Sequence, residues 1–284
     1  MSGTLYLVPT PIGCLDDLSP RARQVLGSVH TVAAEDTRVT RRLYDDLGLA
    51  APRLLSNHDH NERERAGQLL DLLRAGHDVA VVSDAGTPLV SDPGFRIVTQ
   101  CIEAALPVVP LPGPSAVTTA LVASGFGTDA WMFLGFPPRQ AKRRRDLLAT
   151  RRFEPATLVF FEAPHRVVDT LGDVHDVLGP RRVCVARSLT KQWEAFLRGD
   201  AASLAERFRA EGKVLGELTV VVEGYDGEAA DAHAALADDL VARLVAAGVS
   251  PGVVRDVVAG ALSVPRRAIY QQALALRDAP EATE

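Results

Sequence analysis

A short apolar strand that runs directly into a turn-rich polar loop is the feature that most constrains the fold of this chain. Residues 79–82 are four consecutive apolar residues, and the loop 83–88 that follows them reads Ser-Asp-Ala-Gly-Thr-Pro. A short apolar run bounded by polar and turn residues is typical of an interior strand. Because ligands bind beyond the carboxyl ends of strands in open α/β sheets, we predict that this loop lines a ligand site.

The same pairing of strand and loop occurs a second time. The apolar segment 107–111 is followed by Pro-Gly-Pro-Ser-Ala at 112–116, and two such loops on neighbouring strands suggest one pocket. Strands and helices alternate through this half of the chain, which indicates βα units and a parallel sheet. The expected strands are 4–8, 31–34, 53–56, 79–82 and 107–111, and the expected helices are 19–26, 39–47, 61–74, 94–105 and 115–124.

The second half has strands that follow one another without an intervening helix, which predicts a mixed sheet and a second α/β domain. The expected strands are 131–135, 156–162, 182–188, 193–198 and 217–223, with helices at 139–149, 165–178 and 201–211. An acidic, Ala-rich linker is expected at 225–235, followed by helices at 236–246, 251–260 and 266–276. We therefore expect two α/β domains, 1–124 and 125–224, and a helical extension at 225–284.

The helical extension allows two interpretations. Its pattern resembles a helix-turn-helix, which would indicate nucleic-acid binding. Residues 226–284, however, hold nine acidic residues and five arginines, and a net charge of −4 is poorly suited to duplex DNA. A structural or interaction role is therefore favoured for this segment.

Composition excludes several classes of protein. The chain has 284 residues, is 47% hydrophobic and 24% charged, and carries a net charge of −5, so it is not a polycation that binds nucleic acid in bulk. Its three cysteines lie far apart without CxxC spacing, which predicts neither a disulfide framework nor a zinc site. We expect no signal peptide and no membrane helix, and hence a soluble cytoplasmic protein.

Two local clusters have competing interpretations. His58-Asp59-His60-Asn61 offers two His residues at i and i+2, a weak metal signal, and a locally hydrogen-bonded polar loop is favoured, so no metal is expected. Residues 139–152 hold seven basic residues and one acidic residue. This basic segment either contacts RNA phosphates or forms a solvated surface, and phosphate contact is favoured.

Polar clusters at many strand ends together resemble the tetrapyrrole methylase superfamily, the class III S-adenosylmethionine methyltransferases, and within it the branch that methylates ribosomal RNA. The motifs that carry the resemblance are Thr10-Pro11-Ile12-Gly13, Glu35-Asp36-Thr37-Arg38, His58-Asp59-His60-Asn61, Ser83 to Pro88 and Pro112 to Ala116. The resemblance covers residues 4–224. The family has Asn after the first-loop Gly, where this chain has Cys14 and thus no side-chain amide.

The resemblance implies that S-adenosylmethionine binds in a cleft between the two α/β domains. The residues it assigns to the cofactor are Pro11, Asp84, Ala85, Gly86, Thr87, Ser115, Ala116, Phe161, Leu189, Glu217 and Leu218. Gly86 would let the backbone approach the ligand closely, and Ser115 would either contact it or cap the helix that it begins.

The acceptor implied by the resemblance is a ribose 2′-hydroxyl, which is a poor nucleophile at neutral pH. Lys191 is the favoured catalytic base, with Glu35 and His165 as supporting candidates. This role requires a lowered pKa at Lys191, which is otherwise a phosphate or oxyanion contact. Glu35 and Asp36 with Arg38 can instead form a structural ion-pair cluster. The residues expected at the RNA are Arg38, Arg139, Lys142, Arg143, Arg144 and Arg166.

The implied activity is 2′-O-methylation of a cytidine in the 16S rRNA of the small ribosomal subunit by a homodimer, without membrane or metal. A tetrapyrrole or corrin methylase is a rival, disfavoured by the basic segment and by a first loop that is not glycine-rich. A non-catalytic RNA-binding factor for ribosome assembly is the other rival.

Overall fold

The computed structural model describes residues 2–58, 60–262 and 264–278, without the side chains of residues 228–234. The chain divides into two compact units, which are described separately. Unit 1 comprises Met1–Thr119 together with Ser188–Glu194, and unit 2 comprises Ala120–Arg187 together with Ala195–Glu284. The segment 188–194 therefore belongs with the first unit although it lies in the chain between two strands of the second.

Unit 1 is built on a five-stranded parallel sheet, which confirms the predicted fold class. Its strand order is β3-β2-β4-β1-β5, and the strands are β1 (Leu5–Leu7), β2 (Thr31–Ala34), β3 (Arg53–Ser56), β4 (Val79–Val82) and β5 (Val108–Pro110). Because all five strands run the same way, their carboxyl ends and the loops that follow them lie at one edge of the sheet. The central strand β4 is fully buried, as its uninterrupted apolar sequence predicts.

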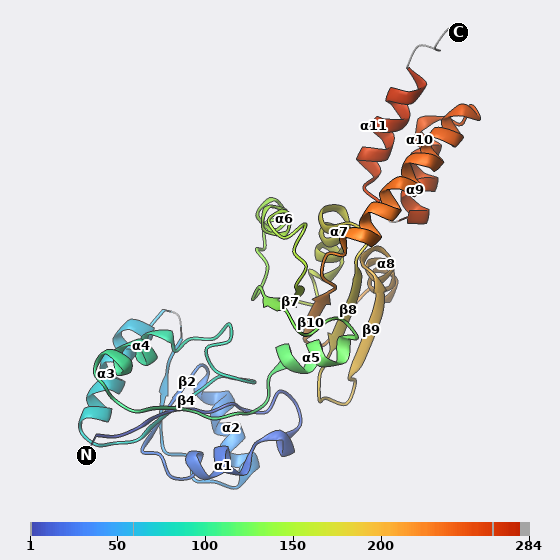
Figure 1. Cartoon of the computed structure of the whole chain (residues 1–284). Coiled ribbons are helices and arrows are strands. Elements are labelled where there is room, and N and C mark those ends of the chain that lie inside the picture. Colours follow the sequence, from blue (N-terminus) through green and yellow to red (C-terminus); the bar gives the residue numbers. More distant parts are fainter. Residues whose placement is uncertain (1, 59, 263, 279–284) are drawn as a thin grey trace. The chain divides into compact units, whose positions relative to one another are not determined.

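Helices cover both faces of this sheet. They are α1 (Pro20–Leu26), α2 (Thr37–Leu47), α3 (Glu62–Arg74) and α4 (Phe95–Glu103). Ala80 and Val82 of β4 pack with residues of α1 and α2, whereas Val79 and Val81 pack with residues of α3 and α4, so alternate side chains enter the two cores (Figure 1). The Ser19 hydroxyl caps α1 by accepting the Ala22 N–H at 3.1 Å.

Unit 2 contains the predicted mixed sheet, in the order β6-β7-β10-β8-β9. Its strands are β6 (Trp131–Phe133), β7 (Thr157–Glu162), β8 (Arg182–Arg187), β9 (Ala195–Asp200) and β10 (Leu218–Val222). β6 and β7 pair in parallel and the remaining pairs are antiparallel. The helices α6 (Ala141–Ala149), α7 (Val167–Leu178) and α8 (Ala201–Glu211) contribute to a core with Leu158 and Phe160. The helix α5 (Ala116–Ser124) crosses the boundary between the units in sequence.

The C-terminal segment is helical earlier than predicted. The linker expected at 225–235 is wrong, because α9 (Gly227–Ala246) already begins at Gly227. The segment is rich in Ala, which has the highest helix propensity, and this outweighs its acidic charge. α9, α10 (Pro251–Leu262) and α11 (Arg266–Arg277) pack around a core that includes Val241, Val254 and Ile269. Among the described residues, no helix is both long and apolar enough to cross a membrane.

Candidate functional site

Hydrogen bonds connect the loops that follow β1 and β4 at the carboxyl edge of the unit 1 sheet. The Thr10 N–H donates to the Gly86 carbonyl at 2.9 Å, and the Gly86 N–H donates to the Thr10 carbonyl at 3.0 Å. Gly86 has a φ of +88°, a conformation that residues other than glycine rarely adopt. The Thr10 hydroxyl also donates to the Ser83 carbonyl at 3.2 Å. These bonds therefore join the two loops.

The loop after β5 contacts the same two loops. The Thr87 hydroxyl donates to the Pro114 carbonyl at 2.9 Å, and a Cβ at Gly113 would lie only 2.6 Å from the Cβ of Pro9. The absence of a side chain at Gly113 thus lets the β1 and β5 loops approach each other. Most of the residues predicted to bind the cofactor from the first domain lie in these connected loops: Pro11, Asp84, Ala85, Gly86, Thr87, Ser115 and Ala116.

Two carboxylates connect the β2 and β4 loops through backbone amides. Asp84 Oδ1 accepts the N–H of Asp36 at 2.9 Å, and Glu35 Oε2 faces the N–H of Asp84 at 3.4 Å. Burial raises the pKa of Asp84 above its ordinary value, since desolvation disfavours its charged form. Asp36 in turn forms an ion pair with Arg38, which lowers the pKa of Asp36 to about 2. The Asp36–Arg38 pair is one part of the ion-pair cluster that the sequence offered as an alternative, and catalysis by Glu35 stays a prediction.

The segment 188–194 packs against the first loop of unit 1. The backbone N–H of Cys14 donates to the Thr190 hydroxyl at 3.0 Å, and a Cβ at Gly13 would lie 2.6 Å from Lys191 Cγ. Because the contact at Cys14 uses its backbone, it does not depend on the side chain at this position. Leu189, predicted to contact the cofactor, is buried, and Lys191 is exposed.

The backbone of this segment is strained. Ser188 has a φ of +50° and Thr190 a φ of +59°, both in the left-handed region although neither is glycine. The Glu194 carboxylate accepts the Thr190 N–H at 2.6 Å and holds the turn. Such strain costs about 1–3 kcal/mol per residue and is concentrated at functional sites. The turn thus fixes the backbone that carries Lys191.

The predicted cofactor residues of unit 2 lie together at one end of its sheet. Phe161 on β7 is half-buried and stacks edge-on with Phe133 at 5.0 Å between ring centroids. Leu218 begins β10 and pairs in register with Glu162, next to Phe161, and Glu217 precedes it. Phe161 and Leu218 are therefore on adjacent strands.

The Glu162–Arg166 pair is structural. Glu162 is 2% exposed and accepts bonds from the Ala163 N–H at 2.7 Å and the Thr170 hydroxyl at 2.5 Å. Arg166 lies 3.3 Å from Glu162 and donates to the Pro137 carbonyl at 2.7 Å. These contacts give Arg166 a bracing role in place of the RNA contact expected from the sequence. His165, one of the predicted catalytic candidates, is exposed beside this pair.

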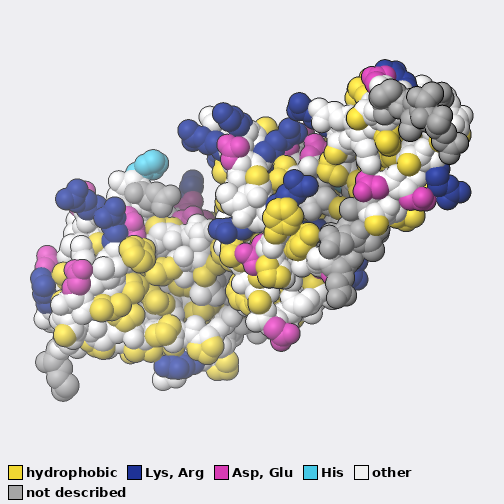
Figure 2. Space-filling view, turned by 45° about the horizontal axis from the view of Figure 1, so that its top comes forward, with side chains coloured by type: hydrophobic (Ala, Val, Ile, Leu, Met, Phe, Trp, Pro, Cys, Tyr) yellow, Lys and Arg dark blue, Asp and Glu magenta, His cyan; other side chains and the backbone are white. Residues whose placement is uncertain are grey.

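The basic segment divides between a buried and an exposed part. Arg144 is 4% exposed and forms an ion pair with Asp173 of α7 at 2.6 Å, so its guanidinium is not available to a phosphate. Arg139, Lys142 and Arg143 are exposed, and Figure 2 shows Lys and Arg side chains gathered in this part of unit 2. Packing of α6 on α7 directs one face of the helix inward, which composition alone does not reveal.

The His58–Asn61 cluster forms a polar turn. The Asn61 side chain accepts the His58 N–H at 2.8 Å and donates to the Ser56 carbonyl at 3.1 Å, the local bonding favoured from the sequence. Asp59 lies outside the described residues. Within the described part of the chain, no group of three or more His, Cys, Asp or Glu side chains could hold a metal ion.

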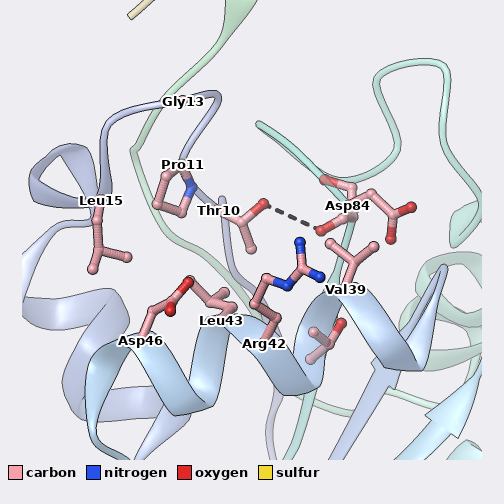
Figure 3. A pocket seen from close by; sticks show the side chains of 11 residues that line it. Thr10, Pro11, Gly13, Leu15, Val39, Arg42, Leu43, Asp46 and Asp84 are labelled. Carbon is pink, nitrogen blue, oxygen red and sulfur yellow. Dashed lines mark hydrogen bonds between the residues drawn. The ribbon is translucent and has the colours of Figure 1, made fainter. Parts of the chain in front are cut away.

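A cavity of about 180 Å³ opens beside Asp84, between the β1 loop and α2 (Figure 3). Val39, Arg42, Leu43 and Asp46 line it from α2. Their spacing of i, i+3, i+4 and i+7 places all four on one face of the helix. The sequence-based prediction missed this group, although an apolar and charged stripe directly after Glu35-Asp36-Thr37-Arg38 was a usable signal.

Comparison with known proteins gives consistent matches over most of the chain. The family model for tetrapyrrole (corrin/porphyrin) methylases matches residues 4–205. A ribosomal RNA small subunit methyltransferase I from Micromonospora olivasterospora is 51% identical over 271 residues, covering 95% of this chain and 86% of that protein. The protein of the same name from Escherichia coli O157:H7 is 46% identical over 231 residues, covering 81% of this chain and 80% of that protein.

Solved structures show the same fold at lower identity. A uroporphyrin-III-C-methyltransferase from Thermus thermophilus has a TM-score of 0.54 at 22% identity and covers 77% of this chain and 94% of its own. The methyltransferase CobJ has a TM-score of 0.59 at 18% identity, covering 78% of this chain and 95% of its own. These likenesses concern the fold, and they agree with the predicted pair of α/β sheets.

Proposed function

This chain belongs to the tetrapyrrole (corrin/porphyrin) methylases and, among them, to the same family as the ribosomal RNA small subunit methyltransferases I, and we propose that it methylates the 2′-hydroxyl of a cytidine in 16S rRNA. As a member of this family it is an S-adenosylmethionine-dependent methyltransferase. The observation that carries the proposal is the 51% identity to a relative of that name over 95% of the chain.

The connected loops of unit 1 fit a nucleoside-type cofactor. The backbone of Gly86 is taken up by its two bonds to Thr10, whereas the exposed Ala85 beside it leaves backbone approachable at the sheet edge, where open α/β sheets bind ligands. We propose that the loop residues 84–87 and 115–116 hold the cofactor at this edge of the unit 1 sheet. When bound, the cofactor supplies a methyl group on a sulfonium centre.

Lys191 is the proposed base for the acceptor hydroxyl. The acceptor hydroxyl loses its proton when its oxygen is methylated, and the Lys191 amine is the proposed acceptor of that proton. The strained turn holds the backbone that carries Lys191, and the packing on Gly13 places the first part of its side chain against the first loop of unit 1. Glu35 faces the backbone of Asp84, and we assign it to positioning that loop.

The exposed cations of the basic segment favour RNA over a tetrapyrrole as the substrate. Arg139, Lys142 and Arg143 are exposed, and guanidinium and ammonium groups on an otherwise acidic protein suit local phosphate contacts. Arg38 is also exposed, beside the β2 loop, but its ion pair with Asp36 already occupies it.

Homodimer formation is a further part of the proposal. Phe95 and Ile102, seven residues apart on one face of α4, are 72% and 67% exposed, and we propose this face as the contact between copies. Sedimentation equilibrium tests it: a mass of one chain would contradict it. Action on ribosomal subunits would place the protein in the cytoplasm.

Tritium transfer tests the proposed function directly. Purified protein and labelled S-adenosylmethionine are incubated with small ribosomal subunits, with large subunits as the control. We expect label in 16S rRNA only. The Lys191→Ala variant should lose transfer while its cofactor affinity, measured by calorimetry, stays unchanged, and Lys213→Ala should behave as the wild type. Near-normal turnover of Lys191→Ala would remove Lys191 from the mechanism.

A further inference from the structure

The cavity above α2 has the size of a site for a small planar group. Its volume of about 180 Å³ is below the roughly 300–1,000 Å³ of pockets that take drug-sized ligands. Pro11 and Leu15 line it from the first loop, and Val39 and Leu43 line it from the helix. Val39 is 42% exposed and Leu15 is 37% exposed, so apolar surface faces the opening. An apolar slot of this size suits a single heterocyclic ring.

Two opposite charges lie at the same cavity. Arg42 and Asp46 both line it from α2, four residues apart and hence on the same helix face. Figure 3 shows the Arg42 guanidinium extending from α2 toward the loops of Thr10 and Asp84, with Asp46 farther along the helix. Among the contacts of the described residues, neither side chain has a hydrogen-bond or ion-pair partner within unit 1. The cavity thus offers both a donor and an acceptor to a ligand.

The cavity adjoins the residues proposed for chemistry. It is lined by Asp84 from the predicted cofactor loop and by Gly13, on which the Lys191 side chain packs. All of these residues belong to unit 1. A nucleotide whose base enters the cavity can therefore place its ribose on the side of Gly13, toward the segment of Lys191.

We propose that this cavity binds the base of the acceptor nucleotide and reads it as cytosine; the inference rests on the proposed function. The Asp46 carboxylate accepts a hydrogen bond from the exocyclic N4 amine, and the Arg42 guanidinium donates to the ring nitrogen N3 and to the carbonyl oxygen O2. Uracil presents an oxygen in place of the amine, so it faces Asp46 with the wrong polarity. A base taken out of its stack is read in this way, by its Watson–Crick edge in an apolar slot.

Matched variants on α2 test the assignment. Arg42→Gln and Asp46→Asn alter the cavity, whereas Arg41→Gln and Asp45→Asn make the same changes one residue away, at exposed positions that do not line it. For methyl transfer to small subunits, we expect kcat/KM to fall about 5- to 150-fold in the first two, the value of one base-discriminating contact. The two controls should stay within about twofold of the wild type, and cofactor affinity should be unchanged in all four.

Base discrimination separates recognition from a merely structural effect. Small subunits with uridine in place of the mapped acceptor cytidine are compared with normal subunits. The ratio of kcat/KM for cytidine over uridine should fall in Asp46→Asn, because an amide offers both a donor and an acceptor, and should persist in Asp45→Asn. If the cavity variants match their controls in both rate and cytidine-to-uridine ratio, the proposed base pocket is wrong while the proposed function still stands. A wild-type protein that transfers no methyl group overturns the proposed function and this assignment together.

Discussion

Asp84 accepts the backbone N–H of Asp36 at 2.9 Å, and this bond joins the loops after two adjacent strands of the unit 1 sheet. Burial raises the pKa of the same carboxyl above its ordinary value of 3.8. Asp84 is thus both a structural acceptor and a group that is costly to ionise in the folded chain.

The raised pKa of Asp84 predicts a pH-dependent cost to stability. As pH rises above 3.8, the unfolded chain releases this proton first while the folded chain retains it, so folding stability falls through the window between the two pKa values. Asp84→Asn keeps an oxygen for the Asp36 N–H and removes the titration. Urea unfolding at pH 4 and pH 7 should show that the variant gains stability relative to the wild type at the higher pH. A difference that is the same at both pH values would contradict this account.

Gly13 should tolerate no side chain. A Cβ there would lie 2.6 Å from both Lys191 Cγ and Thr190 Oγ1, so Gly13→Ala must displace the 188–194 segment. Such overpacking costs about 1–3 kcal/mol, and we expect methyl transfer to fall with it. Gly67→Ala is the control, since this exposed helical glycine has no atom within 4 Å of the added Cβ and should be stabilised by about 0.5–1 kcal/mol. Thermal unfolding of the two variants would refute the packing argument if their order were reversed.

The Arg144–Asp173 pair is expected to be a stability element. Both side chains are about 5% exposed or less, so Asp173→Asn leaves a buried guanidinium without its counter-charge and should cost about 3–5 kcal/mol. Asp176→Asn removes only an exposed partner of Arg145 and should cost about 0–1 kcal/mol. Denaturant midpoints measure both, and equal losses would show that burial does not set the cost.

The expected fold followed from residues whose preference is local. Strands such as 79–82 are apolar throughout, and Ser19 with Pro20 marks the start of α1. The alternation of strands and helices that defines a parallel sheet could therefore be predicted from the sequence. What the sequence missed depends on tertiary contacts. Arg144 and its exposed neighbours have the same composition, and only the packing of α6 against Asp173 separates them.

The candidate site also has one part that local sequence predicts and another that depends on tertiary contacts. The loop at 83–88 could be predicted from its motif, because Gly and Pro constrain the backbone directly. The assignment of segment 188–194 to unit 1 rests on a contact with Cys14 from 176 residues away, which no local pattern encodes. The cavity stripe on α2 was readable as helical spacing, but its function depends on the loop that faces it.

Lys142 and Arg143 should set the salt dependence of RNA binding. Both are exposed, so replacing them with Gln should lower the magnitude of the slope of log K against log salt by about 1 for each phosphate that is no longer neutralised. Arg266→Gln with Arg267→Gln removes an equal exposed charge on α11 and serves as the control. Filter binding to small-subunit RNA at several salt concentrations gives the slopes, and identical slopes for the two double variants would leave the basic segment as a solvated surface.

Alkaline hydrolysis of the labelled product is the most direct measurement of the central claim. A methyl group on the 2′-oxygen removes the hydroxyl that attacks the adjacent phosphate, so hydrolysis of 16S rRNA labelled by the wild-type protein should leave the tritium in an alkali-stable dinucleotide with cytidine at its 5′ position. Tritium recovered in mononucleotides would place the methyl group on a base and contradict 2′-O-methylation.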